Sequence, residues 1–238
     1  MKIIFLNRYF HPDISATSQM LSDQAFALAR DGHQVVVITT RQTYADAEAG
    51  LPACERILGV TAHRVWTSSF GRHRLVGRAI DYASFFLTAA GQLVRVMRPG
   101  DIVVTKTDPP LLSLVTTPLC ALRGAKSVNW LQDIFPEVAE RLGVGRGRLA
   151  GIGYGILRKL RDASLRAADE NVVLGAVMQR DVERLKVPAS RIVQIPNWAN
   201  GEAIKPSARA QNALRADWDL DDAFVVAHAG NLVRTHDA

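Results

Sequence analysis

Two carboxylates follow one of the most apolar segments of the chain. Asp133 and Glu137 come after a run at 126–131 that predicts a strand, and they lie one helical turn apart if Phe135-Pro136 begins a helix. Carboxylates at the carboxyl end of a strand are placed to accept hydrogen bonds from the hydroxyl groups of a ligand. A simpler interpretation stays open, in which Asp133 caps a helix and Glu137 interacts favourably with its dipole.

Two further polar segments are expected at the same edge of the sheet. The segment 106–110 follows a predicted strand, and its Asp108 is either a ligand-binding carboxylate or the start of an Asx turn before proline. The first predicted strand leads into an eleven-residue loop, 7–17, which contains His11 and Asp13. Long loops at strand ends of α/β sheets are where ligands bind, and this loop lacks the glycines of a dinucleotide-binding turn.

The metal-binding and redox residues indicate an ordinary cytoplasmic chain. The six histidines show no spacing typical of a metal site, so we expect no metal. Cys54 and Cys120 lie far apart and have no CxxC partner, which fits a reducing compartment. The N-terminal apolar run is too brief for a signal peptide, and no run reaches the ~20 residues that cross a bilayer.

The elements that must position these residues alternate along the chain. Short β-branched runs, most of them continuously apolar, are separated by segments of helical period, which predicts a parallel sheet covered by helices on both faces. We therefore expect a doubly wound, Rossmann-like α/β domain. The predicted strands are 2–6, 34–39, 60–65, 101–105, 126–131, 170–174 and 191–195, and the predicted helices are 17–31, 74–97, 149–168 and 176–185.

A second domain is expected to begin near residue 200. The segment 196–201 has turn chemistry, and it is followed by a short helix predicted at 208–217 and a strand predicted at 223–229. A strand running into Gly230-Asn231 is typical of the start of a nucleotide-binding domain. We divide the chain into an N-terminal domain, 1–200, and a linker with the start of a second domain, 201–238.

The composition excludes several classes of protein and favours an anionic partner. With 48% hydrophobic and 22% charged residues, the chain is neither a disordered tail nor a disulfide-dense miniprotein. A formal charge of +6 attracts anionic surfaces or ligands. Nucleic acid is disfavoured because the sequence has neither a recognition-helix motif nor an aromatic RNA platform.

Basic residues on two predicted helices suggest docking on an anionic membrane surface. In the helix at 149–168, an apolar stripe that includes Ile152, Ile156 and Leu160 is expected to face the core, opposite a basic face. A second basic cluster begins the helix at 74–97, beside Phe85 and other aromatic residues. The alternative is a solvated helix face. The residues expected at the membrane are Arg72, Arg74, Arg78, Arg158, Lys159 and Arg161.

Taken in order, several segments resemble the N-terminal domain of family 4 retaining glycosyltransferases, which have the two-domain GT-B fold. The segments are the Tyr-Phe-His-Pro-Asp loop at 9–13, the Ala-Arg-Asp-Gly-His turn at 29–33, Pro-Gly-Asp-Ile at 99–102, Asp-Ile-Phe-Pro-Glu at 133–137, Ile-Pro-Asn at 195–197 and Ala-Gly-Asn-Leu at 229–232. The resemblance covers nearly the whole chain. The variant with Asp-Ile-Phe-Pro-Glu and Gly-Asn-Leu is most similar to enzymes of capsule, exopolysaccharide or O-antigen assembly.

The resemblance implies transfer of a sugar from a nucleotide sugar to an acceptor hydroxyl with retention of anomeric configuration. The N-terminal domain would bind a saccharide or polyprenyl-linked acceptor, with the nucleotide sugar as donor substrate and no cofactor. We expect Asp133 as the catalytic residue and assign the other contacts by position. Acceptor contacts are expected from His11, Asp13, Asp108 and Glu137, and donor contacts from Ala16, Thr17, Gly230, Asn231 and Arg234.

Departures from the family pattern concern the donor contacts. Ala16-Thr17 occupies the place of a usual Gly-Gly pair, Gly175 stands where the family often has Ser, and 234–237 lack the usual Lys-Gly. The resemblance also implies that the donor domain's glutamates lie beyond Ala238, so the chain alone is expected to be nearly inactive. Two alternatives stay open: a sugar-nucleotide 2-epimerase of the same fold, and a non-catalytic glycan-binding or membrane-binding module.

Overall fold

The computed structural model describes residues 1–71, 75–137, 140, 148–199, 201, 204–220 and 222–226. Internal contacts divide the chain into two compact units, Met1–Pro196 and Asn197–Ala238. The division falls inside the segment 196–201 that the sequence identifies as a turn.

The first unit is built on an eight-stranded sheet with the order β3-β4-β2-β1-β5-β6-β7-β8. All neighbouring strands are parallel except β3 and β4, which form an antiparallel pair at one edge. The strand order reverses direction at β1, which pairs with β2 on one side and with β5 on the other. The strands are β1 (Lys2–Leu6), β2 (Gln34–Thr40), β3 (Cys54–Ile57), β4 (Val60–Val65), β5 (Ile102–Lys106), β6 (Lys126–Trp130), β7 (Glu170–Val173) and β8 (Ile192–Gln194).

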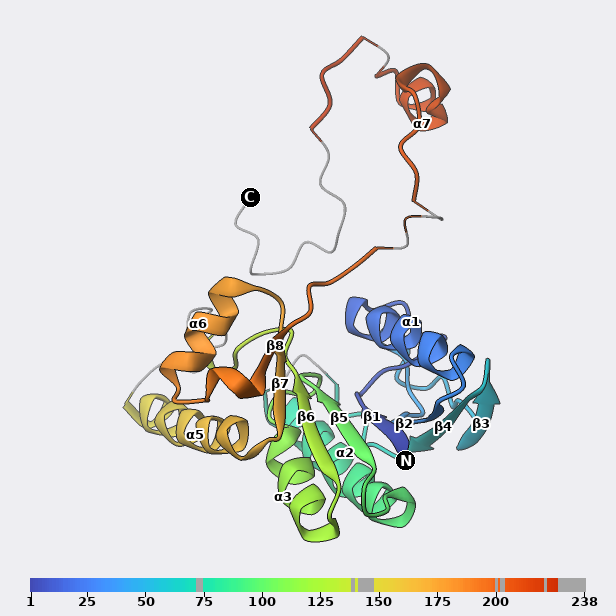
Figure 1. The fold of residues 1–238 in the computed structure, drawn as a ribbon. Helices are drawn as coiled ribbons and strands as arrows, with labels where there is room; N and C mark the ends of the chain where they lie inside the picture. The colour runs from blue at the N-terminus through green and yellow to red at the C-terminus, as the bar shows by residue number, and fades with distance from the viewer. Residues whose placement is uncertain are drawn as a thin grey trace. The chain divides into compact units, whose positions relative to one another are not determined.

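Helices cover both faces of this sheet, as the continuously apolar strands predict. Figure 1 shows α1 on one face and α2, α3 and α5 on the other, with α6 beside α5, where Leu165 of α5 and Val182 of α6 share a buried cluster. The expectation of a doubly wound α/β fold is confirmed. The helices are α1 (Ala16–Arg30), α2 (Leu75–Val96), α3 (Ser113–Arg123), α5 (Arg148–Ala167) and α6 (Ala176–Arg184).

Two elements were not predicted from the sequence, for different reasons. Helix α3 contains Pro118 and follows two other prolines. Because proline disfavours a helix interior, the sequence did not predict a helix in this apolar segment. It ends at Gly124, whose φ of 68° is the left-handed conformation that closes many helices. Strand β3 is short and mostly exposed, so its residues carry no apolar pattern.

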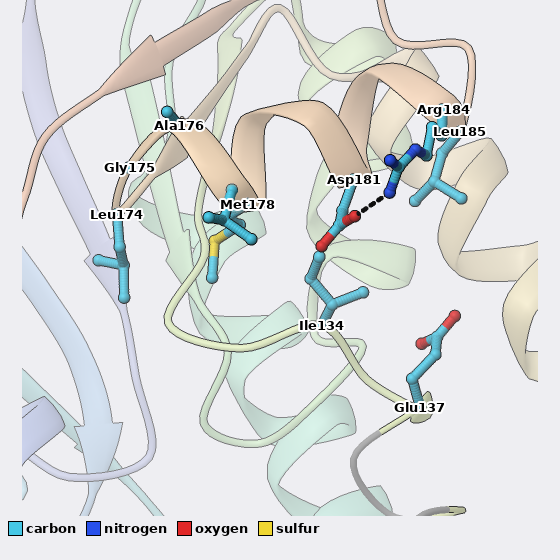
Figure 2. A pocket seen from close by; sticks show the side chains of 10 residues that line it. Ile134, Glu137, Leu174, Gly175, Ala176, Met178, Asp181, Arg184 and Leu185 are labelled. Atoms are coloured by element: carbon cyan, nitrogen blue, oxygen red, sulfur yellow. Dashed lines mark hydrogen bonds and ion pairs between the residues drawn. The ribbon is translucent and has the colours of Figure 1, made fainter.

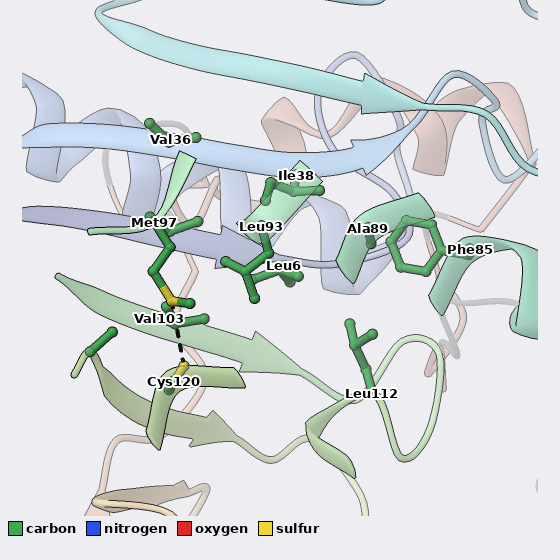
Figure 3. Close-up of a cluster of buried hydrophobic side chains, with 12 residues drawn as sticks. Leu6, Val36, Ile38, Phe85, Ala89, Leu93, Met97, Val103, Leu112 and Cys120 are labelled. Carbon is green, nitrogen blue, oxygen red and sulfur yellow. Dashed lines mark hydrogen bonds between the residues drawn. The ribbon is translucent and has the colours of Figure 1, made fainter. Parts of the chain in front are cut away.

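The main core lies between the sheet and the α2–α3 layer (Figure 3). Leu6, Ile38 and Val103 extend from three central strands toward α2, where Phe85 and Leu93 are fully buried. The placement of Phe85 corrects the expectation that it lies at a membrane-facing surface. Cys120 of α3 closes this core against Met97, and burial raises the pKa of its thiol to about 12.

The apolar stripe of α5 predicts which face of the helix is buried, and the structure buries the opposite face. Ile152, Ile156 and Leu160 are 58%, 55% and 45% exposed, whereas Arg161 and Leu165 are buried. The helix packs on α3, where Ser164 Oγ donates to Ser113 Oγ at 2.9 Å. Because small and polar side chains form this contact, the stripe of large apolar residues is left at the surface.

The second unit contains little regular structure in its described residues. The helix predicted at 208–217 is a short 3₁₀ turn, Arg209–Gln211, followed by α7 (Ala213–Asp217), which Asn212 caps by accepting from the Leu214 N–H at 3.1 Å. Residues 223–226 of the predicted strand are not in a strand, and 227–229 lie outside the described residues. Gly230, Asn231 and Arg234 also lie outside them. Among the described helices, none combines the length and apolar character needed to cross a bilayer.

Candidate functional site

The carboxyl ends of β1 and β5 meet at the point where the strand order reverses, which is where open α/β sheets bind ligands. Backbone hydrogen bonds join these strand ends tightly. The Arg8 N–H donates to the Asp108 carbonyl at 2.7 Å, and the Arg8 carbonyl accepts from the Thr40 N–H at 3.0 Å and the Thr39 hydroxyl at 2.8 Å. Residues just past three strands are thereby held at one edge.

A hollow of about 170 Å³ opens at this edge, and we call it the switch-point hollow. It would hold about six waters at ~30 Å³ each, so it suits a group the size of one sugar ring. Of the acceptor residues that the resemblance implies, Asp108 lies here. The lining residues are Arg8, Tyr9, Tyr44, Gly71, Arg78, Asp81, Tyr82 and Asp108.

Asp81 of α2 shapes the wall of the hollow, although the sequence interpretation did not single it out. Its carboxylate accepts from the Ser68 hydroxyl at 2.7 Å, the Phe70 N–H at 3.0 Å and the Gly71 N–H at 3.1 Å. These bonds occupy both oxygens and fix the segment between β4 and α2. The available signal was an acidic residue inside an otherwise apolar helical segment.

The predicted site residues of the first loop lie outside the switch-point hollow. The Asp13 carboxylate accepts from the Ser15 N–H at 2.8 Å, the Ser15 hydroxyl at 2.5 Å and the Tyr44 N–H. It therefore joins this loop to the segment after β2. Ala16 and Thr17 form the start of α1, and the exposed His11 packs edge-on against Phe26 at 5.6 Å between ring centroids.

Replacing Asp13 with asparagine is expected to destabilise the first unit by about 2 kcal/mol, because hydrogen bonds to a charged acceptor contribute about 1.5–3 kcal/mol and an amide NH₂ cannot accept. Urea unfolding at pH 7 measures the change. As a control, Asp31→Asn alters an exposed carboxylate with no side-chain bond among the described residues, and it should shift stability by less than about 0.5 kcal/mol. Equal stability of both variants would contradict the assigned role of Asp13.

Asp133 lies past the end of β6, in a slot of about 30 Å³ that would hold about one water. Burial raises the pKa of its carboxyl, while the Thr107 hydroxyl acts in the opposite direction. Its Oδ1 atom is buried without a hydrogen-bond partner among the described residues. A buried acceptor in this condition favours binding of a donor such as a ligand hydroxyl or a water.

Lys106 is the last residue of β5, directly before Thr107 of the slot. The side chain is 1% exposed, and among the described residues its ammonium has no hydrogen-bond partner. The Nζ atom stands 3.7 Å from the centroid of the Trp130 ring, which supplies a cation–π contact. Burial lowers the pKa of Lys106 to about 7, and the nearby Asp108 carboxylate partly opposes that shift.

Glu137 and Arg161 form an ion pair that corrects one sequence-based expectation. The Arg161 guanidinium donates to both Glu137 carboxylate oxygens, at 2.8 and 3.0 Å, and to the Phe135 carbonyl at 2.9 Å. This contact holds the pKa of Glu137 below its usual range even though burial acts to raise it. Because Arg161 is only 6% exposed, the expectation that it lies on a membrane-facing surface is wrong.

A larger groove of about 700 Å³ opens where the segments after β6 and β7 meet the start of α6. Figure 2 shows Leu174 and Met178 toward one side of the groove, and Glu137 and the Asp181–Arg184 ion pair, 2.8 Å long, toward the other. Its lining is mostly apolar. The groove therefore offers a wide opening beside the polar sites but few hydrogen-bonding groups of its own.

The remaining basic residues expected at a membrane have different surroundings. Arg78 and Lys159 are exposed, and Arg158 is partly exposed and paired with Glu140. Arg72 and Arg74 lie outside the described residues. Within the described part of the chain, no group of three or more His, Cys, Asp or Glu side chains is placed to hold a metal ion.

A doubly wound sheet with charged and aromatic side chains at its topological switch point defines a Rossmann-like, ligand-binding lobe. The glycosyl transferase 4-like domain matches residues 16–198 of this chain. The match covers more than half of the chain, so the chain belongs to that family, as the sequence resemblance indicated.

Two curated relatives are glycosyltransferases by name. The chain is 33% identical over 142 residues to the "Probable glycosyltransferase WbjE" of Pseudomonas aeruginosa, a match that covers 58% of this chain and 34% of the relative. It is 28% identical over 251 residues to the "Putative colanic acid biosynthesis glycosyl transferase WcaI" of Escherichia coli K12, over 98% of this chain and 59% of the relative. Each match leaves a large part of the relative uncovered.

Solved structures share the fold at low sequence identity. Alr3699/HepE of Anabaena, determined in complex with UDP, has a TM-score of 0.62 at 13% identity, over 98% of this chain and 54% of that protein. Sucrose-phosphate synthase of Thermosynechococcus elongatus has a TM-score of 0.61 at 17% identity, over 92% and 53%. These likenesses support the α/β lobe of the GT-B type that the sequence predicted.

Proposed function

We propose that this chain is the acceptor-binding part of a glycosyltransferase that uses a nucleotide sugar and retains the anomeric configuration. The observation that carries the proposal is the family match over 16–198, together with Asp108 and Asp133 past the ends of neighbouring strands β5 and β6. The partial coverage of both relatives supports a division of labour in which further residues bind the donor. On this proposal the 238-residue chain alone has little transferase activity.

The donor assignment rests on related folds and on position. Structures of HepE contain UDP and UDP-glucose, which favours a nucleotide sugar for this chain as well. Ala16 and Thr17 begin α1, whose amino end would face the donor phosphates, and the partial positive charge there would stabilise them. Gly230, Asn231 and Arg234 complete the proposed donor contacts.

In the proposed reaction, the bond from the anomeric carbon to the diphosphate breaks and a bond to an acceptor oxygen forms. The proton of the acceptor hydroxyl passes to the leaving phosphate, whose growing negative charge is stabilised by backbone N–H groups and cations. The buried Oδ1 atom of Asp133 would accept a hydrogen bond from the acceptor and so orient its hydroxyl. Asp108 would hold a second hydroxyl in the switch-point hollow.

Saturation-transfer NMR on the whole chain tests the proposal. We expect oligosaccharides to bind more strongly than nucleotide sugars, and Asp108→Asn and Asp133→Asn each to weaken saccharide binding about tenfold, because a hydrogen bond to a charged group is lost. Asp31→Asn, which precedes β2 at the opposite edge of the sheet, is the control and should bind as the unmodified chain does.

The other outcomes separate the remaining functions. Nucleotide-sugar binding without saccharide binding would favour a sugar-nucleotide 2-epimerase and contradict the acceptor role. Turnover of a nucleotide sugar by the 238-residue chain would contradict the proposed partial role. Saccharide binding without any sugar transfer, even when a nucleotide sugar and a donor-binding domain are supplied, would favour a glycan-binding module.

We also infer that the first unit docks on an anionic membrane surface on the cytoplasmic side, where polyprenyl-linked acceptors would be presented. The exposed stripe Ile152, Ile156 and Leu160 lies beside the exposed Lys159 and the partly exposed Arg158, so α5 offers both apolar and cationic groups. Such helices bind at lipid interfaces by burying the apolar residues and attracting anionic head groups.

The double substitution Ile152→Ser, Ile156→Ser is expected to reduce binding to vesicles containing anionic phospholipid at least tenfold, because burial of each isoleucine contributes about 1.5–3 kcal/mol. Co-sedimentation measures the change, with purely zwitterionic vesicles for comparison. The matched control is Leu122→Ser on α3, which removes another exposed apolar side chain. An equal loss in both variants, or no loss in either, would rule out docking through α5.

A further inference from the structure

Arg8 is a buried cation that forms an ion pair with no acidic side chain among the described residues. The residue is 6% exposed, and it lines the switch-point hollow directly after β1. Among the described residues its guanidinium makes neither a hydrogen bond nor an ion pair, and its Nε atom is buried without a partner. Its side-chain neighbours are instead aromatic, with the centroids of the Tyr9 and Tyr82 rings each 5.3 Å from Cζ.

Such an arrangement is unfavourable for a protein whose hollow holds only water or a neutral group. A buried guanidinium loses much of its hydration, and cation–π contacts return about 0.5–2 kcal/mol each. The desolvation cost of a buried charge is offset when an opposite charge binds next to it. The rigid, planar fork of Arg matches the two oxygens of a carboxylate or phosphate better than any other side chain does.

The acids of the hollow do not serve as that partner. Asp81 is occupied by the Ser68 hydroxyl and by two backbone N–H groups of the neighbouring segment. Asp108 lines the hollow just after β5 and has a partner of its own. A ligand that reached both residues would bring an anionic group to Arg8 and a hydroxyl group to Asp108.

We propose that the switch-point hollow selects an acidic sugar, with its carboxylate or phosphate bound to Arg8, a hydroxyl donated to Asp108 and its ring packed against the tyrosines. This inference rests on the proposed acceptor role and narrows the acceptor to an anionic class. Tyr44 stands edge-on to Tyr9 at 5.9 Å between centroids, so aromatic rings extend along the lining of the hollow. The exposed Arg78 adds a second cation to that lining.

Isothermal titration of the whole chain with glucose, glucuronic acid, glucose 1-phosphate and inorganic phosphate tests the proposal. We expect at least one acidic sugar to bind about tenfold or more tightly than glucose, which corresponds to about 1.4 kcal/mol. Tighter binding of glucuronic acid identifies a carboxylate as the ligand group, and tighter binding of glucose 1-phosphate identifies a phosphate. Inorganic phosphate should bind more weakly than the preferred sugar, because it makes no contact with Asp108.

Variants of Arg8 test whether the preference for acidic sugars depends on the positive charge of the side chain or on the planar shape of the guanidinium. Arg8→Met should abolish the preference for acidic sugars, and Arg8→Lys should retain only part of that preference because an ammonium lacks the planar fork. Arg30→Met, an exposed substitution at the end of α1 that removes the same charge, should leave all affinities unchanged. Thermal unfolding gives a second readout, in which the preferred sugar raises the Tm of the unmodified chain but not that of Arg8→Met.

The binding experiments distinguish failure of this inference from failure of the proposed acceptor role. Equal binding of glucose and both acidic sugars, or a preference that survives Arg8→Met, would overturn this inference and leave the acceptor role intact. Equal binding of inorganic phosphate and the preferred acidic sugar would show a site for an anion alone and would overturn the assignment to a sugar. Absence of binding by any saccharide would overturn both this inference and the proposed function.

Discussion

Replacing Lys106 with methionine is expected to stabilise the first unit at pH 7 by about 2 kcal/mol or more. The lysine is fully buried, and its ammonium contacts the Trp130 ring without a hydrogen-bond partner among the described residues. Charged lysine is therefore disfavoured in the folded state, which is why burial lowers its pKa to about 7. Methionine has a similar length, keeps the contact with the aromatic ring and carries no charge.

The lowered pKa of Lys106 also predicts how the stability of the first unit depends on pH. Between pH 7 and about 10.5 the unfolded chain binds a proton on Lys106 that the folded chain has released, so stability rises with pH. The unmodified chain should gain about 1.5 kcal/mol between pH 7 and 8.5, and Lys106→Met should lose that gain. The measurement stays below pH 9, because the Cys120 thiol, whose pKa is raised to about 12, destabilises the fold once the unfolded thiol ionises.

Urea unfolding at pH 7.0 and 8.5 supplies both numbers. Lys159→Met is the control, since Lys159 is exposed on α5 and its substitution should change neither the stability nor the pH dependence by more than about 0.5 kcal/mol. A destabilised Lys106→Met would mean that the ammonium is stabilised in the fold by a partner. A variant that keeps the rise with pH would assign that rise to another titrating group.

The strands were predictable because a buried strand consists of consecutive apolar residues. Strands such as β1 and β2 are covered on both faces, so each reads as a continuous apolar run whatever packs against it. The orientation of α5 was not predictable in the same way. Its apolar stripe suggests an inward face, but α5 contacts α3 through Ser164 and turns Arg161 toward the segment after β6, and no local pattern predicts that orientation.

The site was predictable where its residues directly follow strands. Asp108 and Asp133 come after apolar runs, and the carboxyl ends of parallel strands gather at one edge. Asp81 and Tyr82 reach the same edge from the first half of α2, which only the tertiary packing reveals. Arg8 is visible in the sequence as a cation between Asn7 and Tyr9, but the lack of a partner for its buried Nε atom among the described residues becomes evident only from burial and contacts.

Replacing Arg161 with methionine is expected to destabilise the first unit by about 2–4 kcal/mol. The guanidinium links α5 to the segment after β6 through both oxygens of Glu137 and the Phe135 carbonyl. Loss of one member of a buried ion pair costs about 3–5 kcal/mol. The Glu137 side chain is 37% exposed and regains some hydration when its partner is removed, which places the expected loss toward the lower end of that range.

The matched control is Arg158→Met on the same helix. Arg158 also approaches Glu137, at 3.9 Å, and it pairs with Glu140, but its side chain is 36% exposed and screened by solvent. Exposed ion pairs contribute at most about 1 kcal/mol, so this variant should lose no more than that in urea unfolding at pH 7. Equal losses in the two variants would show that Arg161 is solvated like a surface residue.

Acid titration of the same two variants tests the cause. The pKa of Glu137 is lowered by Arg161, so the ion pair stabilises the fold above about pH 4.5 and that contribution is lost as the pH falls through the folded-state pKa. The difference in unfolding free energy between the unmodified chain and Arg161→Met should therefore shrink between pH 7 and pH 3.5. A difference that stays constant over this range would assign the effect to the Phe135 carbonyl and to packing of the Arg161 stem. It would show that neither Glu137 nor Asp162, which Arg161 Nε contacts at 2.6 Å, contributes through its charge.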